Sequence, residues 1–329
     1  MYPQEDKPKK TKLIIFTTTF VYLMILIVGY LNLTSIQDYI KLYNYKAPSA
    51  ISDLAAQDTM TDYTRHLFYL NSPQILDTVT SFRNQCSETK NIIVLGCYKI
   101  GQKGIYIYKV NNPLLAGINQ VTAAHEVLHS VYERLSVADR NQLNKDLQYY
   151  YDNKLTDTNV KAEIALYQKY EPNSVYDEMS CTYGTELKDL TPNLEKYYSK
   201  YFSNRLTIYN YYASYESQFN SRIAKIYSYD TKLTSMNSNI KSQQLNLSSL
   251  YSQINTLKAK MDSLKNTNVI SYNSLVSSYN SLVKQYNDLR DSNLTLVDQY
   301  NSIVVLRNSI VDDLKKLDQA IDTTIITSS

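Results

Sequence analysis

The chain has no tryptophan, and among its 329 residues it has only six glycines, three histidines and three cysteines. With so few glycines, it contains neither a glycine-rich phosphate loop nor a dinucleotide fingerprint, and it has no serine-nucleophile elbow. The formal net charge is +3, and the basic residues do not gather as a phosphate-binding face requires. We therefore expect no nucleic-acid partner, and neither nucleotide-dependent nor serine-dependent catalysis.

Two of the three histidines, His125 and His129, lie in one motif, H-E-V-L-H, which also contains Glu126. Residues four apart share a helix face, so both rings can bind one zinc ion. Glu126 lies about 100° further round the helix, where it can take a proton from a water on the metal. Apolar residues at helical spacing support a helix here, at Val121, Ala124, Leu128, Val131 and Leu135.

A catalytic zinc ion takes three protein ligands and keeps one position open. The remaining histidine, His66, has no spacing relation to the motif, and we interpret it as a structural residue. A later helix is predicted over residues 175–187, and its Glu178 is the favoured third ligand. The alternatives on this and neighbouring segments are Glu186, Asp177, Glu163 and Cys181.

An H-E-x-x-H helix followed by a glutamate on a later helix resembles the gluzincin group of zinc metallopeptidases. The resemblance covers roughly residues 90–190 and depends on His125, His129 and Glu178. It implies hydrolysis of peptide bonds, with one zinc ion as cofactor and Glu126 as general base.

The same group commonly has an aspartate four residues after the ligand glutamate, where it orients the first motif histidine. Here that position holds Thr182, so the residues that support the ligands stay open, with Thr182, Tyr183 and Glu186 as candidates. The transition-state donor of the group, a late histidine or tyrosine, is not assigned either. Tyr176 and Tyr183 are candidates by proximity alone.

The resemblance also implies an edge strand that precedes the motif helix and pairs with an extended substrate. Two short runs rich in β-branched and aromatic residues are candidates, at 91–98 and 104–110, with a hairpin-like connector between them. Neither face of the second run is wholly polar. This is compatible with an edge strand, because a bound peptide would lie beside it. We predict that this run contacts substrate through Ile105, Tyr106, Ile107 and Tyr108. A purely structural hairpin is the alternative.

No charge occurs between Lys12 and Asp38, and residues 13–31 are long enough to span the ~30 Å hydrocarbon core as a helix. The preceding tail carries four lysines, which places the N-terminus in the cytoplasm and the rest outside. A cleaved signal peptide is the alternative, but the run is longer than a signal core and no A-x-A-like site follows. We predict a single-pass signal anchor in the cell membrane.

The spacing of Cys86 and Cys97 could close a small disulfide loop, which an exported domain permits. Cys181 would then remain unpaired. Three free thiols are the alternative.

Apolar residues recur at heptad spacing over 233–264 and again over 272–321. The phase slips after 265–268, which contains asparagines suited to a turn. This pattern predicts an antiparallel coiled-coil hairpin, and the alternative is one long helix that dimerises in parallel. Each seam has a polar interruption, Gln243 in the first and Asn293 in the second, and Asn293 would help to fix the register. Such a coil is a spacer or a surface for a protein partner.

The sequence thus predicts an α+β, mostly helical chain. Its parts are a cytoplasmic tail (1–12), a transmembrane anchor (13–31), a zincin-like metallopeptidase domain (32–200) and a coiled-coil hairpin (201–329). The predicted function is zinc-dependent hydrolysis of a protein or peptide outside the cytoplasm. A cell-wall amidase that acts on peptide cross-bridges would share this chemistry. The alternative from another class is a non-catalytic envelope scaffold or adhesion protein with a structural or vestigial metal site.

Overall fold

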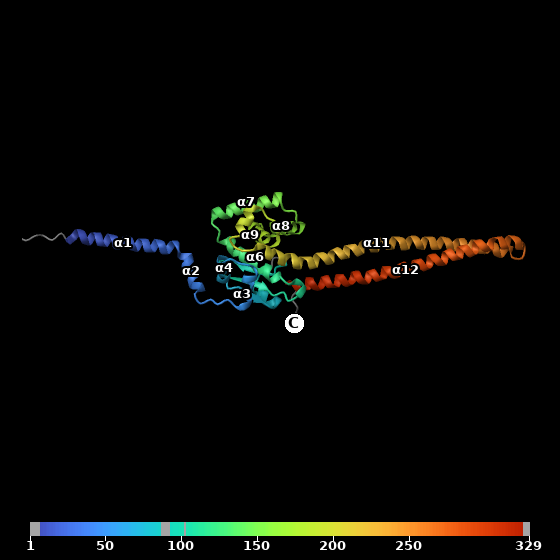
Figure 1. Cartoon of the computed structure of the whole chain (residues 1–329), viewed down its shortest axis with the longest axis horizontal. Coiled ribbons are helices and arrows are strands. Elements are labelled where there is room, and N and C mark those ends of the chain that lie inside the picture. Colours follow the sequence, from blue (N-terminus) through green and yellow to red (C-terminus); the bar gives the residue numbers. More distant parts are fainter. Residues whose placement is uncertain (1–6, 87–92, 102, 325–329) are drawn as a thin grey trace, which may run out of the picture. The chain divides into compact units, whose positions relative to one another are not determined.

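The structure is a computed structural model that describes residues 7–86, 93–101 and 103–324 (Figure 1). Helices predominate, with one small sheet, so the predicted α+β, mostly helical class is confirmed. The chain divides into two compact units. Unit 1 contains the chain up to Val110, then Gly117–Tyr212, and the chain from Thr323; unit 2 contains Asn111–Ala116 and Ala213–Asp322.

Most of the helices belong to unit 1. In order they are α1 (Lys7–Leu31), α2 (Leu33–Leu42), α3 (Ser49–Gln57), α4 (Asp62–Leu70), α5 (Val79–Gln85), α6 (Ile118–Glu133), α7 (Val137–Asn153), α8 (Thr158–Tyr170), α9 (Val175–Glu186) and α10 (Pro192–Tyr198). The start of α11 (Arg205–Leu264), up to Tyr212, lies in unit 1. The rest of α11 lies in unit 2 with α12 (Val269–Ile321) and the short 3₁₀ helix η1 (Pro113–Leu115).

The sheet has three strands, β1 (Gln74–Leu76), β2 (Gly96–Lys99) and β3 (Gly104–Tyr108), in the order β1-β3-β2. β1 runs parallel to β3, and β2 runs antiparallel to it. The predicted first run, 91–98, is therefore shorter than expected, and its residues 91 and 92 lie outside the described part of the chain.

The prediction that residues 104–110 form the edge strand is wrong, because β3 is the central strand of the sheet. Ile105 and Ile107 are fully buried and Tyr106 is nearly so, which leaves them no surface on which to bind a substrate. Tyr108 pairs with Leu76 on β1, so the β3 backbone is not open to a substrate there. The apolar character of both faces is the physical reason: it is typical of a strand covered on both sides.

The motif helix α6 lies in the core of unit 1, where it packs against α9, β2, β3 and α4. Small residues such as Ala123 and Ala124 are fully buried on it. Its crossing with α9 is close at Gly184, where a Cβ atom would lie 2.7 Å from Leu128 Cδ1 and 2.7 Å from Tyr198 Cε1. Glycine at this position lets α9 approach α6 closely enough to bring its own polar residues to the histidines.

Unit 2 is an antiparallel pair of long helices, α11 and α12, joined by a turn in which the Asn268 side chain caps α12 by accepting from the Ser271 amide. The two polar seam residues meet each other: Asn293 Nδ2 donates to Gln243 Oε1 at 3.1 Å. The predicted hairpin is found, and the predicted register residue has its partner on the opposite helix.

The predicted anchor residues form α1, whose apolar side chains are exposed, among them Phe16, Phe20, Tyr22, Leu23, Ile25, Leu26 and Val28. Within the described residues, no single helix meets the length and hydropathy of a membrane span. The pair Phe16–Tyr30 and Ser35–Leu42, bent by 65°, meets them jointly. α2 is tied to the end of α6 by Asp38, whose carboxylate accepts two hydrogen bonds of 2.8 Å from Arg134.

The chain returns to unit 1 after α12. The Thr323 hydroxyl donates to the Val94 carbonyl at 2.9 Å, and the Thr324 carbonyl accepts from Arg83 at 2.8 Å. Thr323 and Thr324, which follow α12, therefore pack within unit 1.

Candidate metal centre

Two helices supply the polar side chains of the site. α6 presents His125, Glu126 and His129, and α9 presents Asp177 and Glu178 from its first turn. The one-turn spacing of the two histidines places both rings on the α9 side of α6, as the motif predicted. Their ring centroids are 5.1 Å apart.

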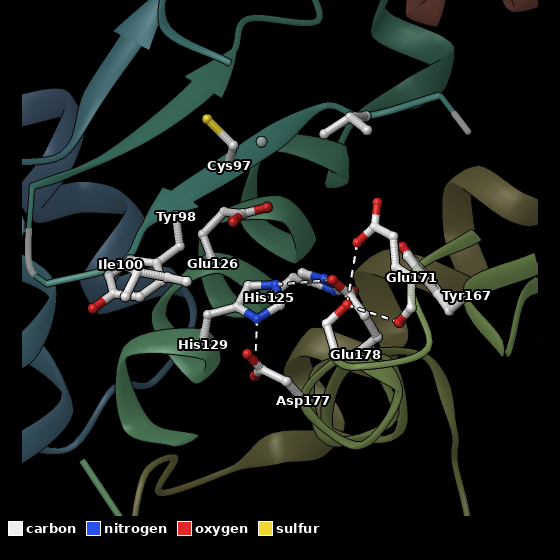
Figure 2. Close-up of a pocket in the computed structure, with 13 residues that line it drawn as sticks. Cys97, Tyr98, Ile100, His125, Glu126, His129, Tyr167, Glu171, Asp177 and Glu178 are labelled. Atoms are coloured by element: carbon white, nitrogen blue, oxygen red, sulfur yellow. Dashed lines mark hydrogen bonds and ion pairs between the residues drawn. The ribbon is translucent and has the colours of Figure 1, made fainter. Parts of the chain in front are cut away.

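The candidate ligands converge on one point (Figure 2). His125 Nε2 lies 3.5 Å from Glu178 Oε2, and His129 Nε2 lies 3.9 Å from Glu178 Oε1. Ligand atoms about 2.0–2.2 Å from a tetrahedral zinc ion are about 3.4 Å apart. The Glu178 carboxylate thus lies at distances from the two rings that are close to those between ligands of one zinc ion, and all three side chains are mostly buried.

His129 is oriented by Asp177, whose Oδ1 lies 2.9 Å from His129 Nδ1. A carboxylate at Nδ1 holds the proton on that nitrogen and leaves Nε2 free to bind a metal. Asp177 was expected only as an alternative ligand. In the structure it hydrogen-bonds the second motif histidine, His129, whereas the position of Thr182 was a candidate to orient the first.

The charges of the site are strongly coupled. Burial lowers the pKa of His129, but the neighbouring Cys181, Asp177 and Glu178 outweigh it and raise that pKa well above its ordinary value. Burial tends to raise the pKa of Glu178, yet His129, together with hydrogen bonds from His125 and Tyr167, lowers it. The two shifts favour a protonated His129 beside an ionised Glu178, and a metal cation that bound His129 would displace that proton.

Glu126 lies beside this point and is 5% exposed, and its Oε2 has no hydrogen-bond partner among the described residues. Burial raises the pKa of Glu126, and the two histidines partly offset this effect. Gly96 on β2 makes room for it, because a Cβ atom there would lie 2.5 Å from Glu126 Oε1. A buried carboxylate with an unpaired oxygen is placed to bind a water molecule and accept its proton.

These groups open into a cavity of about 280 Å³. One wall comes from β2 and the residues around it, including Gly96, Cys97, Tyr98 and Ile100. The Tyr98 ring stacks on the His129 ring with centroids 6.4 Å apart, and its hydroxyl donates to Glu133 at the end of α6. The edge strand beside the site is therefore β2.

A second ligand set uses the same histidines. Potential ligand atoms of His125, His129 and Cys181 lie within 4.8 Å of one another. Cys181 is fully buried, and its thiol lies 3.9 Å from Asp177 Oδ1. It does not line the cavity, whereas Glu178 does. An ion held by the Glu178 set would be open to the cavity, and an ion held by the Cys181 set would lie in the protein interior.

Several other predicted residues do not reach the cavity. His66 is exposed on α4. Tyr183 is buried against Tyr150, with ring centroids 5.2 Å apart, and Tyr176 donates to Gln148. Glu186 lines a different cavity, and Thr182 is fully buried.

Sequence reasoning missed two residues that do line the cavity, Tyr167 and Glu171. Tyr167 lies on α8 and hydrogen-bonds Glu178, and burial raises its pKa far above the ordinary range. Neither residue belongs to a motif, and only the packing of α8 on α9 brings them in. No pattern in the sequence distinguishes Tyr167 from the other tyrosines of the chain.

Cys86 at the end of α5 and Cys97 on β2 form the expected disulfide, with Cα atoms 5.8 Å apart, and Cys181 is free. The disulfide joins the cavity wall to α5.

In comparisons with protein-family models, curated proteins and solved structures, no match to this chain is found.

Proposed function

We propose that this chain is a membrane-anchored zinc metallopeptidase whose active site faces the extracytoplasmic side. The observation that carries the proposal is the convergence of His125, His129 and Glu178 beside the buried, unpaired carboxylate oxygen of Glu126. A structural metal site has no use for such a carboxylate. A hydrolytic site requires one, because a water molecule must lose a proton as it attacks.

In this proposal the three ligands would hold zinc, which polarises the scissile carbonyl and makes a nearby water more acidic. Glu126 accepts the proton of the attacking water and returns it to the leaving amine. Its raised pKa suits both steps. Asp177 holds the His129 ring in the binding tautomer.

The substrate would be an extended polypeptide that pairs with β2. Among the described residues this strand pairs with β3 alone, along one edge, and its residues form a wall of the cavity. Strand addition at the other edge would carry a substrate carbonyl past the histidines. β2 takes the place that the sequence assigned to β3.

The membrane anchor is proposed from α1, whose exposed apolar side chains need a nonpolar environment. The lysines of the N-terminal tail favour a cytoplasmic N-terminus. The Cys86–Cys97 disulfide favours an oxidising compartment for unit 1. The hairpin of unit 2 would act as a spacer or bind a protein partner.

The test is cleavage of casein by the zinc-loaded wild type and by Glu126→Gln. We expect cleavage by the wild type and a rate about 10²–10⁴-fold lower in the variant, with zinc content unchanged. Zinc binding without any cleavage by the wild type would contradict the peptidase proposal.

A second candidate is a non-catalytic envelope protein that binds a structural metal. The observation that favours it is the His125–His129–Cys181 group, because buried thiolate and imidazole ligands are typical of closed zinc sites. Under this alternative Cys181→Ser loses zinc and Glu178→Ala retains it. The peptidase proposal expects the reverse.

A further inference from the structure

The cavity carries more negative charge than hydrolysis requires. Four carboxylates line it, those of Glu126, Glu171, Asp177 and Glu178, and no lysine or arginine lies among its described lining residues. Three of the four have the roles given above. A dipositive metal ion would neutralise half of the total, so the loaded site would remain negative and would attract cations.

Glu171 is the carboxylate without a role in the chemistry. It ends α8, and its carboxylate accepts a hydrogen bond of 3.2 Å from the hydroxyl of Ser174, the residue that precedes α9. This contact holds the side chain in the short turn between the two helices. The C-terminal end of α8 adds partial negative charge to the same wall.

The two sides of the cavity differ in character. Figure 2 shows Glu171 with Tyr167 on one side of the histidines, and Tyr98 with Ile100 on the other. Ile100 is 76% exposed, so that side offers an apolar surface. A bound polypeptide would therefore meet negative charge on one side of the scissile bond and an apolar surface on the other.

We propose that Glu171 selects substrates with a cationic group beside the scissile bond, either a lysine or arginine side chain or a free amino terminus. This inference rests on the proposed function, because it assumes that peptides bind in the cavity. A charge pair in a partly enclosed cavity is screened less than one at the surface. Glu171 is thus a specificity residue and takes no part in bond cleavage.

Binding can test this without turnover, in the zinc-loaded full-length Glu126→Gln protein. The probes are an N-acetylated, C-amidated alanine-based peptide with one central lysine, its norleucine counterpart, and the norleucine peptide with a free amino terminus, each with a fluorescent label. We expect one cationic peptide to bind about tenfold more tightly than the blocked norleucine peptide, equivalent to about 1.4 kcal/mol. The cationic peptide that shows the gain identifies the source of the charge.

Adding Glu171→Gln should reduce this preference to less than about twofold, because glutamine keeps the shape and removes the charge. The matched control is Glu163→Gln, which removes one carboxylate from the same helix, α8, but outside the cavity lining. The control should keep the preference.

Three results would overturn the inference: no preference for either cationic peptide, a preference that survives Glu171→Gln, or an equal loss in Glu163→Gln. Because the readout is binding, these results are separate from a failure of cleavage, which would count against the proposed function instead.

Discussion

Unit 2 repeats one packing solution along two helices, whereas unit 1 brings chemically different side chains from distant segments to one point. In unit 2 the buried Asn293 and the half-buried Gln243 hydrogen-bond each other across the seam. In unit 1, Glu126 and Asp58 keep buried carboxylate oxygens without partners among the described residues. Unpaired buried polar atoms cost stability. We infer that the polar residues of unit 2 fix the register of its two helices, whereas the unpaired Glu126 carboxylate in unit 1 lowers the stability of the fold at the candidate site.

The largest expected effect separates the two ligand sets of unit 1. Glu178→Ala should lose bound zinc, and Cys181→Ser should keep it. The reason is that Glu178 lines the cavity with the histidines and Cys181 does not. The measurement is metal content of the purified protein by mass spectrometry. Zinc retained by Glu178→Ala and lost by Cys181→Ser would place the ion in the interior and remove the open hydrolytic site.

Gly96→Ala should lower kcat by about 100-fold, since a methyl group there would displace the Glu126 carboxylate. Zinc content should not change, because Gly96 is not a ligand. Gly29→Ala is a matched control, since nothing lies within 4 Å of its added Cβ atom. Unchanged kcat in Gly96→Ala would show that the Glu126 position is not critical.

Zinc affinity should rise with pH. The pKa of His129 is raised in the absence of metal, so below that pKa zinc must displace a proton, and above it none remains to displace. One displaced proton changes the apparent affinity about tenfold per pH unit. Competition with a chromophoric chelator at pH 6 and pH 8 measures this slope. An affinity independent of pH would mean that His129 does not bind the ion.

The polar seam of unit 2 offers a smaller test. Replacing Gln243 and Asn293 together by leucine should raise the stability of the hairpin by about 1 kcal/mol, because a polar pair gives way to apolar packing. Asn293→Leu alone should not, since it leaves the Gln243 amide without its partner. Urea unfolding followed by circular dichroism measures both. If Asn293→Leu alone were as stable as the double variant, the hydrogen bond between Asn293 and Gln243 would not contribute to the stability of the hairpin.

The smallest effect concerns Asp58, which is fully buried and whose pKa burial raises well above its ordinary value. Its cost to stability is absent below the pKa of the unfolded chain and grows as pH rises through the folded pKa. Asp58→Asn should therefore raise the melting temperature at pH 7 more than at pH 4. Calorimetry at the two pH values checks this, and an equal shift at both would show that the charge is not the cause.

The sequence predicted those parts that depend on local spacing. Heptad spacing identified both long helices and the Asn293 seam position, and the one-turn spacing of His125 and His129 identified the motif helix. Glu178, predicted on the helix that follows the motif, lies beside both histidines in the structure.

Features that depend on tertiary packing were not predictable. Strand order in a sheet is set by contacts far apart in sequence, so β3 was mistaken for the edge strand. The same holds for Tyr167 and Glu171, which reach the cavity only through the packing of α8 on α9. The role of Asp177 was hidden because an adjacent carboxylate, Glu178, competed for the same assignment.

Anomalous X-ray diffraction at the zinc edge, from crystals of the zinc-loaded full-length protein, tests the central claim most directly. The account predicts one peak within about 2.3 Å of His125 Nε2, His129 Nε2 and a Glu178 oxygen, open to the cavity beside Glu126. A peak bonded to the Cys181 sulfur, or no peak near the two histidines, would contradict it.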